Sequence, residues 1–305
     1  MTVEQKKCGI VSIIGRPNVG KSTLLNQIVG EKVAIVSKVP QTTRQPIRGI
    51  YTEERGQIIF IDTPGLHLGK DRLDELMNQT ASGALKDMDC IIYLVDTSRD
   101  TGEEEKNIVN KLKNIKTPLV LGLNKIDLGG KYVSSHIALL EKTQGKKVTE
   151  MENFSMIALS GKKELNLDEL LGIVFNYLPV GPALYPEDVV TDAPQKMVIA
   201  DIIREKLFEL MRNELPHSIG VMIESMKPNR KTMNVKAAIL VERESQKEIV
   251  IGKGGSVLKK VGTLARMELE ELLEMKVYLE LFVKARKNWR DDRNMLEELG
   301  YVSST

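Results

Sequence analysis

The segment from Gly15 to Ser22 has the residue types and spacing needed to hold a phosphate group. It reads Gly-Arg-Pro-Asn-Val-Gly-Lys-Ser, follows an apolar run at 9–14 and precedes a helical pattern at 22–29. Glycines let successive backbone N–H groups face one anion, and a helix N-terminus adds partial positive charge. We expect Lys21 to reach the β- and γ-phosphates of a nucleoside triphosphate and Ser22 to bind Mg²⁺. A glycine-rich turn with a chance lysine is disfavoured by the strand–loop–helix setting. The predicted nucleotide contacts in this loop are Gly15, Pro17, Asn18, Val19, Gly20, Lys21, Ser22 and Thr23.

Two later segments supply groups for the metal and the γ-phosphate. Asp62-Thr63-Pro64-Gly65 ends an apolar run at 57–61. We expect Asp62 to hold Mg²⁺ through a water and Gly65 to turn its amide toward the γ-phosphate, because nothing blocks the glycine backbone. Between the phosphate loop and this segment, Thr43 is expected to complete the Mg²⁺ shell, in preference to Thr42. A plain loop is the alternative. Lys21, Thr43 and Gly65 are thus the predicted catalytic residues.

The tetrapeptide Asn124-Lys125-Ile126-Asp127 indicates which base is bound. It directly follows an apolar run at 119–123. The Asp127 carboxylate can accept hydrogen bonds from guanine N1–H and from the exocyclic amine, which adenine does not offer in that arrangement. We expect Asn124 to bridge loops beside the base and the stem of Lys125 to pack along the ring plane. A site built for such bonds rejects the wrong base, because its polar groups are otherwise left unpaired.

The residues beside the γ-phosphate predict slow hydrolysis. In Ras-like GTPases a glutamine after the Asp-x-x-Gly motif orients the attacking water, whereas this chain has Leu66 there. Asn18 stands where GTPases of the translation-factor-related class use an asparagine to hold K⁺. A monovalent cation there would offset charge in the way an arginine finger does.

Composition, cysteine content and the lengths of the apolar runs together lead us to expect a cytoplasmic protein. The chain has 305 residues, 42% of them hydrophobic and 28% charged, with a formal net charge of +2. This length is typical of about two domains. Cys8 and Cys90 lie in apolar runs, so we expect buried, reduced thiols. No apolar run is long enough for a transmembrane helix, and the first seven residues do not resemble a signal peptide.

The order of elements changes near residue 180. Before it, apolar runs alternate with helical patterns, which predicts an α/β P-loop domain with a mostly parallel sheet and helices on both faces. The expected strands are 9–14, 57–61, 90–95, 119–123 and 154–159, and the expected helices are 22–29, 72–85, 103–112, 132–140 and 167–177. The stretch 178–194 contains four prolines and is expected to be an extended interdomain linker.

The C-terminal part predicts an α-β-β-α-α-β order. Helices are expected at 198–215, 247–251 and 256–273, and strands at 221–225, 234–241 and 277–283. The Gly252-Lys253-Gly254-Gly255 segment fits the Gly-x-x-Gly loop of a KH domain, which joins two helices and clamps about four nucleotides. Lysines gather at this end of the long helix and glutamates at its far end. The alternative is a solvated helix with a glycine turn. The predicted RNA contacts are Ile251, Gly252, Lys253, Gly254, Gly255, Lys259 and Lys260.

The C-terminal tail carries several basic residues around Trp289. This tryptophan could stack on a base. A single tryptophan more often anchors a terminal segment to its domain, and we favour that interpretation.

Taken together, these motifs resemble the Era family of GTPases over essentially the whole chain. The likeness includes Pro-Gln-Thr-Thr-Arg at 40–44, Arg204-Glu205-Lys206 and Trp289-Arg290. It implies a GTPase domain at 1–178, a linker at 179–196 and a type II KH domain with a basic tail at 197–305. It also implies GTP, GDP and Mg²⁺ as ligands, and Ser160 and Gly161 as part of the base site. Related GTPases usually have alanine at the position of Gly161, which makes the geometry of that loop less certain.

The resemblance also implies a biological role. A member of this family is expected to bind the 3′ end of the small-subunit (16S) ribosomal RNA and to act in small-subunit assembly. It is expected to be a monomer in the cytoplasm, with peripheral contact to the inner face of the cell membrane. The alternative is a signalling GTPase whose C-terminal domain docks a protein or the membrane surface.

Overall fold

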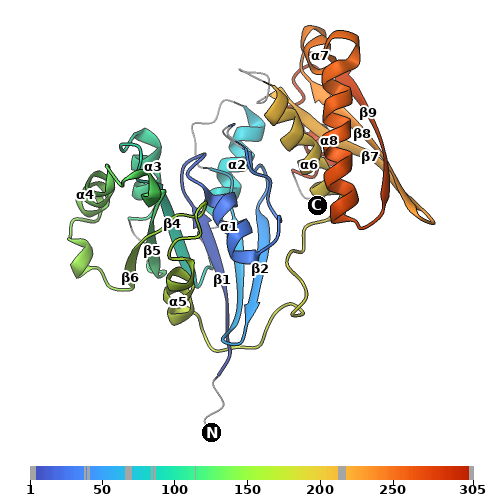
Figure 1. The fold of residues 1–305 in the computed structure, drawn as a ribbon. Coiled ribbons are helices and arrows are strands. Elements are labelled where there is room, and N and C mark those ends of the chain that lie inside the picture. The colour runs from blue at the N-terminus through green and yellow to red at the C-terminus, as the bar shows by residue number, and fades with distance from the viewer. Residues whose placement is uncertain are drawn as a thin grey trace. The chain divides into compact units, whose positions relative to one another are not determined.

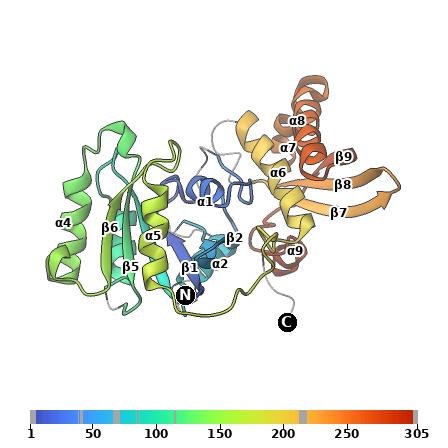
Figure 2. The same ribbon diagram turned by 60° about the horizontal axis from the view of Figure 1, so that its bottom comes forward.

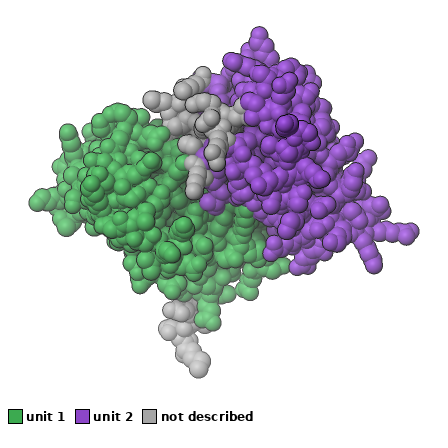
Figure 3. Space-filling model, turned by 45° about the horizontal axis from the view of Figure 1, so that its top comes forward, with its two compact units in different colours: residues 1–34, 43–69, 77–192 green, residues 35–42, 70–76, 193–305 purple. Residues whose placement is uncertain are grey.

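The structure, a computed structural model, divides the chain into two compact units. It describes residues 5–37, 39, 42–65, 71–83, 85, 87–113, 115–211 and 218–301. Unit 1 comprises residues 1–34, 43–69 and 77–192, and unit 2 comprises residues 35–42, 70–76 and 193–305 (Figure 3). The predicted catalytic-loop position Leu66 lies outside the described residues.

Unit 1 is built on a six-stranded sheet in the order β2-β3-β1-β4-β5-β6. Its strands are β1 (Lys7–Ile14), β2 (Ile47–Glu53), β3 (Gly56–Asp62), β4 (Cys90–Asp96), β5 (Leu119–Asn124) and β6 (Phe154–Ala158). All neighbours pair in parallel except β2 and β3, which are antiparallel. The predicted mostly parallel sheet is therefore confirmed. Every residue of β4 is buried, as its unbroken apolar run requires for a strand covered on both faces.

Helices cover both faces of this sheet (Figures 1 and 2). They are α1 (Lys21–Val29), α2 (Arg72–Gly83), α3 (Glu103–Lys111), α4 (Val133–Gln144) and α5 (Leu167–Tyr177). Side chains of α2, α3 and α4 share one apolar cluster with alternate residues of β4 and β5. Helices α1 and α5 lie on the other face (Figure 1). Cys8 and Cys90 are buried free thiols, as predicted, and burial raises the pKa of Cys90 to about 12.

The proline-rich stretch is attached to unit 1 and is not a free linker. The N–H of Cys8 donates to the carbonyl of Pro179, and the N–H of Ile50 donates to that of Val190. Gln57 of β3 accepts hydrogen bonds from two backbone N–H groups of the stretch and donates to one of its carbonyls. The extended conformation was predicted from the prolines. Its docking was not, because its backbone partners come from strands far away in the sequence.

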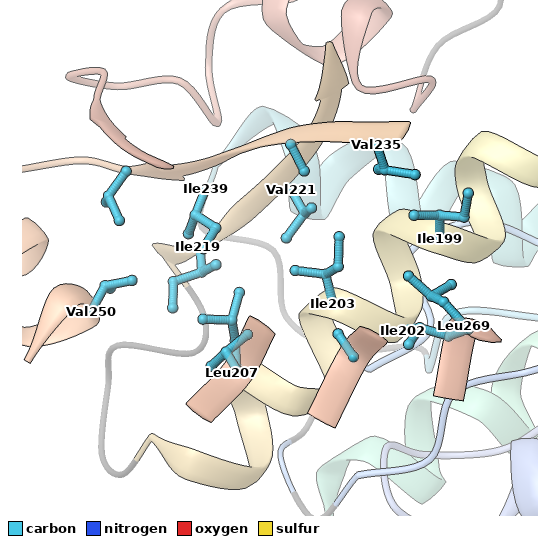
Figure 4. Close-up of a cluster of buried hydrophobic side chains, with 14 of the residues drawn as sticks. Ile199, Ile202, Ile203, Leu207, Ile219, Val221, Val235, Ile239, Val250 and Leu269 are labelled. Atoms are coloured by element: carbon cyan, nitrogen blue, oxygen red, sulfur yellow. The ribbon is translucent and has the colours of Figure 1, made fainter. Parts of the chain in front are cut away.

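Unit 2 is a three-stranded sheet whose core-forming helices lie on one face. Its elements are α6 (Gln195–Leu210), β7 (Gly220–Asn229), β8 (Thr232–Val241), α7 (Glu244–Ile251), α8 (Ser256–Leu272), β9 (Lys276–Ala285) and α9 (Arg293–Glu298). The sheet order is β7-β8-β9, with β7 antiparallel and β9 parallel to β8. Figure 4 shows the core, in which Ile199, Ile203 and Leu207 of α6 approach Val235 and Ile239 of β8. The predicted α-β-β-α-α-β order is confirmed, with both hairpin strands longer than expected. Helix α9 was not expected.

Two short segments from the N-terminal part of the chain belong to unit 2. The N–H of Val36 donates to the carboxylate of Glu205 at 2.9 Å. The guanidinium of Arg204, which is buried, donates to the carbonyl of Thr42 at 3.0 Å. In the second segment, Arg290 forms ion pairs with Asp71 and Asp74. The sequence assigned both segments to the GTPase domain; their partners Arg204, Glu205 and Arg290, distant in sequence, give them to unit 2.

Trp289 anchors the C-terminal tail to unit 2. Its side chain is 1% exposed, and its indole N–H donates to the carbonyl of Ser218 at 3.0 Å. The ring packs directly over Gly220, where a Cβ atom would lie 3.1 Å from it. The anchoring interpretation is therefore confirmed, and this tryptophan does not stack on a base. Among the described helices, none has the length and hydropathy needed to cross a bilayer.

Candidate functional site

The predicted phosphate loop connects the end of β1 to the start of α1. Gly20 precedes the helix with φ of 107°, a left-handed conformation that glycine adopts without strain. A Cβ atom on Gly20 would also lie 2.6 Å from the side-chain nitrogen of Asn124. Lys21 is buried, and its ammonium donates to the carbonyls of Gly15 and Arg16, each at 3.1 Å. The loop therefore has the bend and the buried cation that a phosphate cradle needs.

Three side-chain oxygens meet beside this loop, and they suit a magnesium ion. The Ser22 hydroxyl donates to the Asp62 carboxylate at 2.6 Å and lies 3.0 Å from the Thr43 hydroxyl. Thr43 also donates to the same carboxylate oxygen at 3.1 Å. The second oxygen of Asp62 is buried and has no hydrogen-bond partner among the described residues. Mg²⁺ prefers hydroxyl and carboxylate oxygens, so this cluster fits the ion predicted from the sequence.

Burial changes the acid–base properties of the same cluster. It lowers the pKa of the Lys21 ammonium, although Asp62 acts against this shift. It raises the pKa of the Asp62 carboxyl, although Lys21 and the hydrogen bonds from Ser22 and Thr43 oppose the change. Both shifts have one physical cause, because burial penalises the charged form of each group. A bound phosphate would stabilise the charged form of Lys21, and a bound cation would stabilise the charged form of Asp62.

The geometry distinguishes the two candidate threonines. Thr42 donates its hydroxyl to the carbonyl of Val39 at 2.7 Å, so it is turned into its own loop. Thr43 is the threonine that lies beside Ser22 and Asp62. Gly65 lies against the phosphate loop, because a Cβ atom on it would be 2.8 Å from the nitrogen of Pro17.

Asn124 ties the base-binding segments together. Its side-chain nitrogen donates to the carbonyl of Val19 at 2.8 Å, and its side-chain oxygen accepts the N–H of Gly161 at 3.0 Å. The N–H of Gly161, a residue predicted to be part of the base site, is thus donated to Asn124. A Cβ atom on Gly161 would lie 3.3 Å from the Cα of Leu24, which is a tight contact. Ser160 is buried in the same turn, where its hydroxyl accepts the N–H of Lys163.

Lys125 links the phosphate loop to an acid that the sequence did not single out. Its ammonium donates to the carbonyl of Asn18 at 2.9 Å and pairs with Asp96 at 2.8 Å. Although burial alone would raise it, hydrogen bonds from Lys125 and Ser98 hold the pKa of Asp96 below its usual value. Asp127 follows two residues later and is exposed, where it can meet a base.

A positional rule could have identified Asp96. It ends β4, and ligands of α/β sheets bind at the carboxyl ends of the strands. Its carboxylate also lies 3.8 Å from the guanidinium of Arg16, which pairs with Glu105 at 2.9 Å. Arg16 is therefore engaged by two acidic residues, Asp96 and Glu105. The remaining loop residues lie as predicted along the loop and the first turn of α1: Pro17, Asn18, Val19 and Thr23.

In unit 2, the glycine loop joins α7 to α8 as predicted. Gly254 has φ of 59°, and a Cβ atom on it would meet no atom within 4 Å. The loop backbone is therefore open to a close approach by another chain, although any side chain there would be strained. Lys253, Lys259 and Lys260 are exposed, while Ile251, Gly252 and Gly255 are partly buried.

A groove of about 470 Å³ runs from this loop between α8 and β9. Gly255, Leu258, Lys259, Gly262, Arg266 and Tyr278 are among its lining residues. Of these, only Gly255 and Lys259 were predicted. Arg266 and Tyr278 were missed, because the groove forms only when the parallel β8–β9 pairing brings the edge strand beside α8. A basic loop that continues into a half-apolar groove can hold the phosphates and bases of a single strand.

Comparison with known proteins agrees with both units. A family model described as a 50S ribosome-binding GTPase matches residues 10–125, and a KH-domain model matches residues 214–290. The GTPase Era of Halothermothrix orenii is 45% identical over 97% of this chain and 98% of its own length. The GTPase Era of Staphylococcus haemolyticus is 44% identical over 98% of each chain.

Solved structures give the same result. One is Era in complex with MgGDPNP and nucleotides 1506–1542 of 16S ribosomal RNA, which matches with a TM-score of 0.91 and 38% identity over 98% of this chain and all of its own. Another is a variant of Aquifex aeolicus Era bound to GDP·AlF4⁻, with a TM-score of 0.89 and 38% identity over 97% of this chain and all of its own. The chain belongs to the Era family and is a GTPase with a mostly parallel P-loop domain followed by a KH domain.

Proposed function

We propose that this protein is a GTP-hydrolysing switch that binds 16S ribosomal RNA near its 3′ end and acts in assembly of the small ribosomal subunit. The observation that carries the proposal is the open glycine loop at 252–255, which continues into the groove between α8 and β9. The related Era structure holds nucleotides 1506–1542 of this RNA. The chain covers that structure along its whole length, including both units.

Hydrolysis rests on positioning and charge. Gly15 to Thr23 hold the phosphates, with Lys21 as the buried cation, and Asn124, Lys125 and Asp127 hold guanine. Ser22, Thr43 and Asp62 would hold Mg²⁺. The bound ion would stabilise the negative charge that develops on the phosphate oxygens during phosphoryl transfer. Gly65, packed on Pro17, presents its backbone to the γ-phosphate side of the loop. Leu66, rather than a glutamine that could orient the attacking water, follows Gly65 in the sequence, so intrinsic turnover is slow.

Potassium is proposed as a further ligand, beside Asn18. This residue lies at the exposed crest of the loop with φ of 61°, and its carbonyl is fixed by Lys125. A K⁺ ion there would offset charge between the β- and γ-phosphates. Turnover measured in KCl and in NaCl of equal ionic strength tests this role. Equal rates in the two salts would remove potassium from the mechanism.

The remaining features of the proposal concern setting. We place the protein in the cytoplasm as a monomer on the small subunit, with peripheral contact to the inner face of the membrane. Flotation of the full chain with anionic vesicles tests the membrane contact directly. If the protein does not float with the vesicles at physiological salt, the membrane contact is excluded and RNA remains the proposed partner.

The loop substitution Gly254→Asp tests RNA binding. It places a carboxylate and a strained backbone where the strand approaches, so RNA affinity should be abolished while GTP affinity is unchanged. Gly145→Asp is the matched control, since Gly145 is also exposed, has φ of 71° and has open space around it. Unchanged RNA affinity in Gly254→Asp would favour the alternative, a signalling GTPase whose C-terminal domain docks a protein or the membrane.

A further inference from the structure

The face of the unit 2 sheet that points away from α6, α7 and α8 carries a second cationic surface. Met233 and Val235 of β8 belong to the core, so Asn234 between them faces the other way. Asn234 pairs with Lys227 on β7 and with Tyr278 on β9. Directly paired residues share a face, so these three side chains form one row across the sheet.

Positive charge is concentrated along the hairpin that β7 and β8 form. From residue 225 to residue 241 the chain carries Lys227, Arg230, Lys231 and Lys236 and no acidic residue. Pairing continues to Asn229 and Thr232, so Arg230 and Lys231 form a tight turn at the tip. In Figures 1 and 2 this hairpin projects away from the helices of its unit.

The three cations nearest the tip are unneutralised. Lys227, Arg230 and Lys231 are exposed, and within the described part of the chain their side chains make no ion pair or hydrogen bond. Lys236, by contrast, pairs with Glu280 at 3.3 Å. Like charges held together on a rigid hairpin repel one another unless an anion joins them.

The other end of the same sheet face is closed. Ala238 and Leu240 lie on it but are fully buried, and Trp289 covers Gly220 beside them. The C-terminal tail thus occupies one half of the face and leaves the cationic half open.

Tyr278 connects this open half to the groove. It lines the groove between α8 and β9 and also stands in the row with Lys227. Its side chain is among the most exposed large side chains of the unit, with the residue 63% exposed. Lys227 lies two strands away, which is about 10 Å at the usual strand spacing. A chain that leaves the groove over Tyr278 therefore meets Lys227 and then the turn.

We propose that this surface, defined as Lys227, Arg230, Lys231 and Tyr278, binds the single-stranded RNA that continues beyond the groove. Tyr278 stacks a base at the edge strand, and the three cations bind the phosphates that follow. An exposed aromatic ring beside cations is the arrangement that sequence-tolerant single-strand binding uses, whereas an anionic membrane would need only the cations. The proposal rests on the proposed RNA-binding function and extends its contact beyond the about four nucleotides of the groove.

The experiment compares short and long RNA on the full chain. The probes are oligoribonucleotides from the 16S 3′ end, one of about four nucleotides to fill the groove and one of about twelve to pass beyond it. The triple variant Lys227→Gln, Arg230→Gln, Lys231→Gln should bind the short probe as the wild type does. For the long probe, the slope of log affinity against log salt should fall by about 2, which is roughly 100-fold in affinity at 0.1 M salt.

Two further variants make the test specific. Tyr278→Ala should weaken the long probe by roughly 5- to 150-fold, as loss of one stacked base does, and Tyr278→Phe should restore it. Lys142→Gln, Lys146→Gln, Lys147→Gln removes the same charge from exposed sites in unit 1 and should change neither probe.

Three outcomes would overturn the proposal. They are equal losses for both probes in the triple variant, a similar loss for the long probe in the unit 1 control, or unchanged RNA affinity of the triple variant with weaker flotation on anionic vesicles, which would give the surface to a membrane. The short probe also separates this proposal from the proposed function: if Gly254→Asp leaves its affinity unchanged, the function itself is wrong.

Discussion

Replacing Asn124 by aspartate gives a quantitative test of the base-binding side of the site. The side chain is 3% exposed, donates to the carbonyl of Val19 and accepts the N–H of Gly161. Aspartate keeps the shape and the acceptor but replaces the donor with a second oxygen. The carbonyl of Val19 then faces an acceptor at the position where the amide nitrogen lay 2.8 Å away.

The size of the penalty is bounded from both sides. Losing the bond and leaving a buried carbonyl unpaired costs about 1–3 kcal/mol. The new carboxyl can instead take up a proton and donate it to Val19. Protonation at pH 7 costs about 4 kcal/mol, because an unperturbed Asp has a pKa of about 3.9 and each pH unit is worth about 1.4 kcal/mol. We therefore expect Asn124→Asp to reduce the free energy of unfolding of unit 1 by about 1–4 kcal/mol.

The same reasoning fixes the sign of the pH dependence. Burial raises the pKa of the introduced carboxyl above its unfolded value, so the folded state binds more protons than the unfolded state. The stability deficit relative to the wild type must then shrink as the pH falls, by up to about 1.4 kcal/mol per pH unit. Asn124→Ala removes both bonds without adding a titratable group, so its deficit should not depend on pH.

The assay is GDP titration calorimetry together with urea unfolding followed by circular dichroism, on wild type and both variants, from about pH 8 to about pH 5.5. A deficit in Asn124→Asp that is constant across this range, or that grows on acidification, would refute the hydrogen-bond assignment.

Three other predictions follow from single contacts. Ser22→Ala removes a hydroxyl from the oxygen cluster, so half-maximal GTP turnover should need more Mg²⁺; an unchanged Mg²⁺ titration would contradict the assignment. Asp96→Asn should lower stability at pH 7 but make the urea unfolding midpoint fall less steeply on acidification. The reason is that the pKa of Asp96 is lowered in the folded state, so its carboxylate contributes stability above the unfolded pKa of about 3.9, and this stability is lost as the pH falls through the folded pKa. A variant as acid-sensitive as the wild type would show that Asp96 carries no such stability. Trp289→Phe removes the indole N–H that donates to the Ser218 carbonyl and should cost about 2–4 kcal/mol in unit 2 by circular dichroism, while GDP affinity in unit 1 stays unchanged.

Sequence patterns predicted the fold of unit 1 because its strands and loops are locally encoded. β4 is one unbroken apolar run, and the loop at 15–22 contains its glycines, its lysine and its serine in order. β2 was missed because its residues, Ile47–Glu53, include Gly49 and follow no simple alternation. Gly49 stands there because a Cβ atom would lie 2.5 Å from Leu25 of α1, and such a contact is visible only after folding.

Long-range contacts account for what the sequence did not predict. The segments at 35–42 and 70–76 were assigned to the GTPase domain from the sequence, yet Arg204, Glu205 and Arg290 bring them into unit 2. Asp96 gains its role only when Lys125 and Arg16 approach it from separate loops. Tyr278 lies in a strand that was predicted from the sequence, whereas its position at the rim of a groove depends on β9 being the edge of its sheet.

The central claim is that one chain joins guanine-nucleotide hydrolysis to binding of the 16S 3′ end through the loop at 252–255. Crosslinking of the full chain to total cellular RNA, with a non-hydrolysable GTP analogue and with GDP, followed by sequencing, tests it most directly. The account predicts crosslinks from residues 251–260 to the 3′ end of 16S ribosomal RNA that are lost in Gly254→Asp and kept in Gly145→Asp. Crosslinks that are scattered over other RNAs, or that persist in Gly254→Asp, would contradict it.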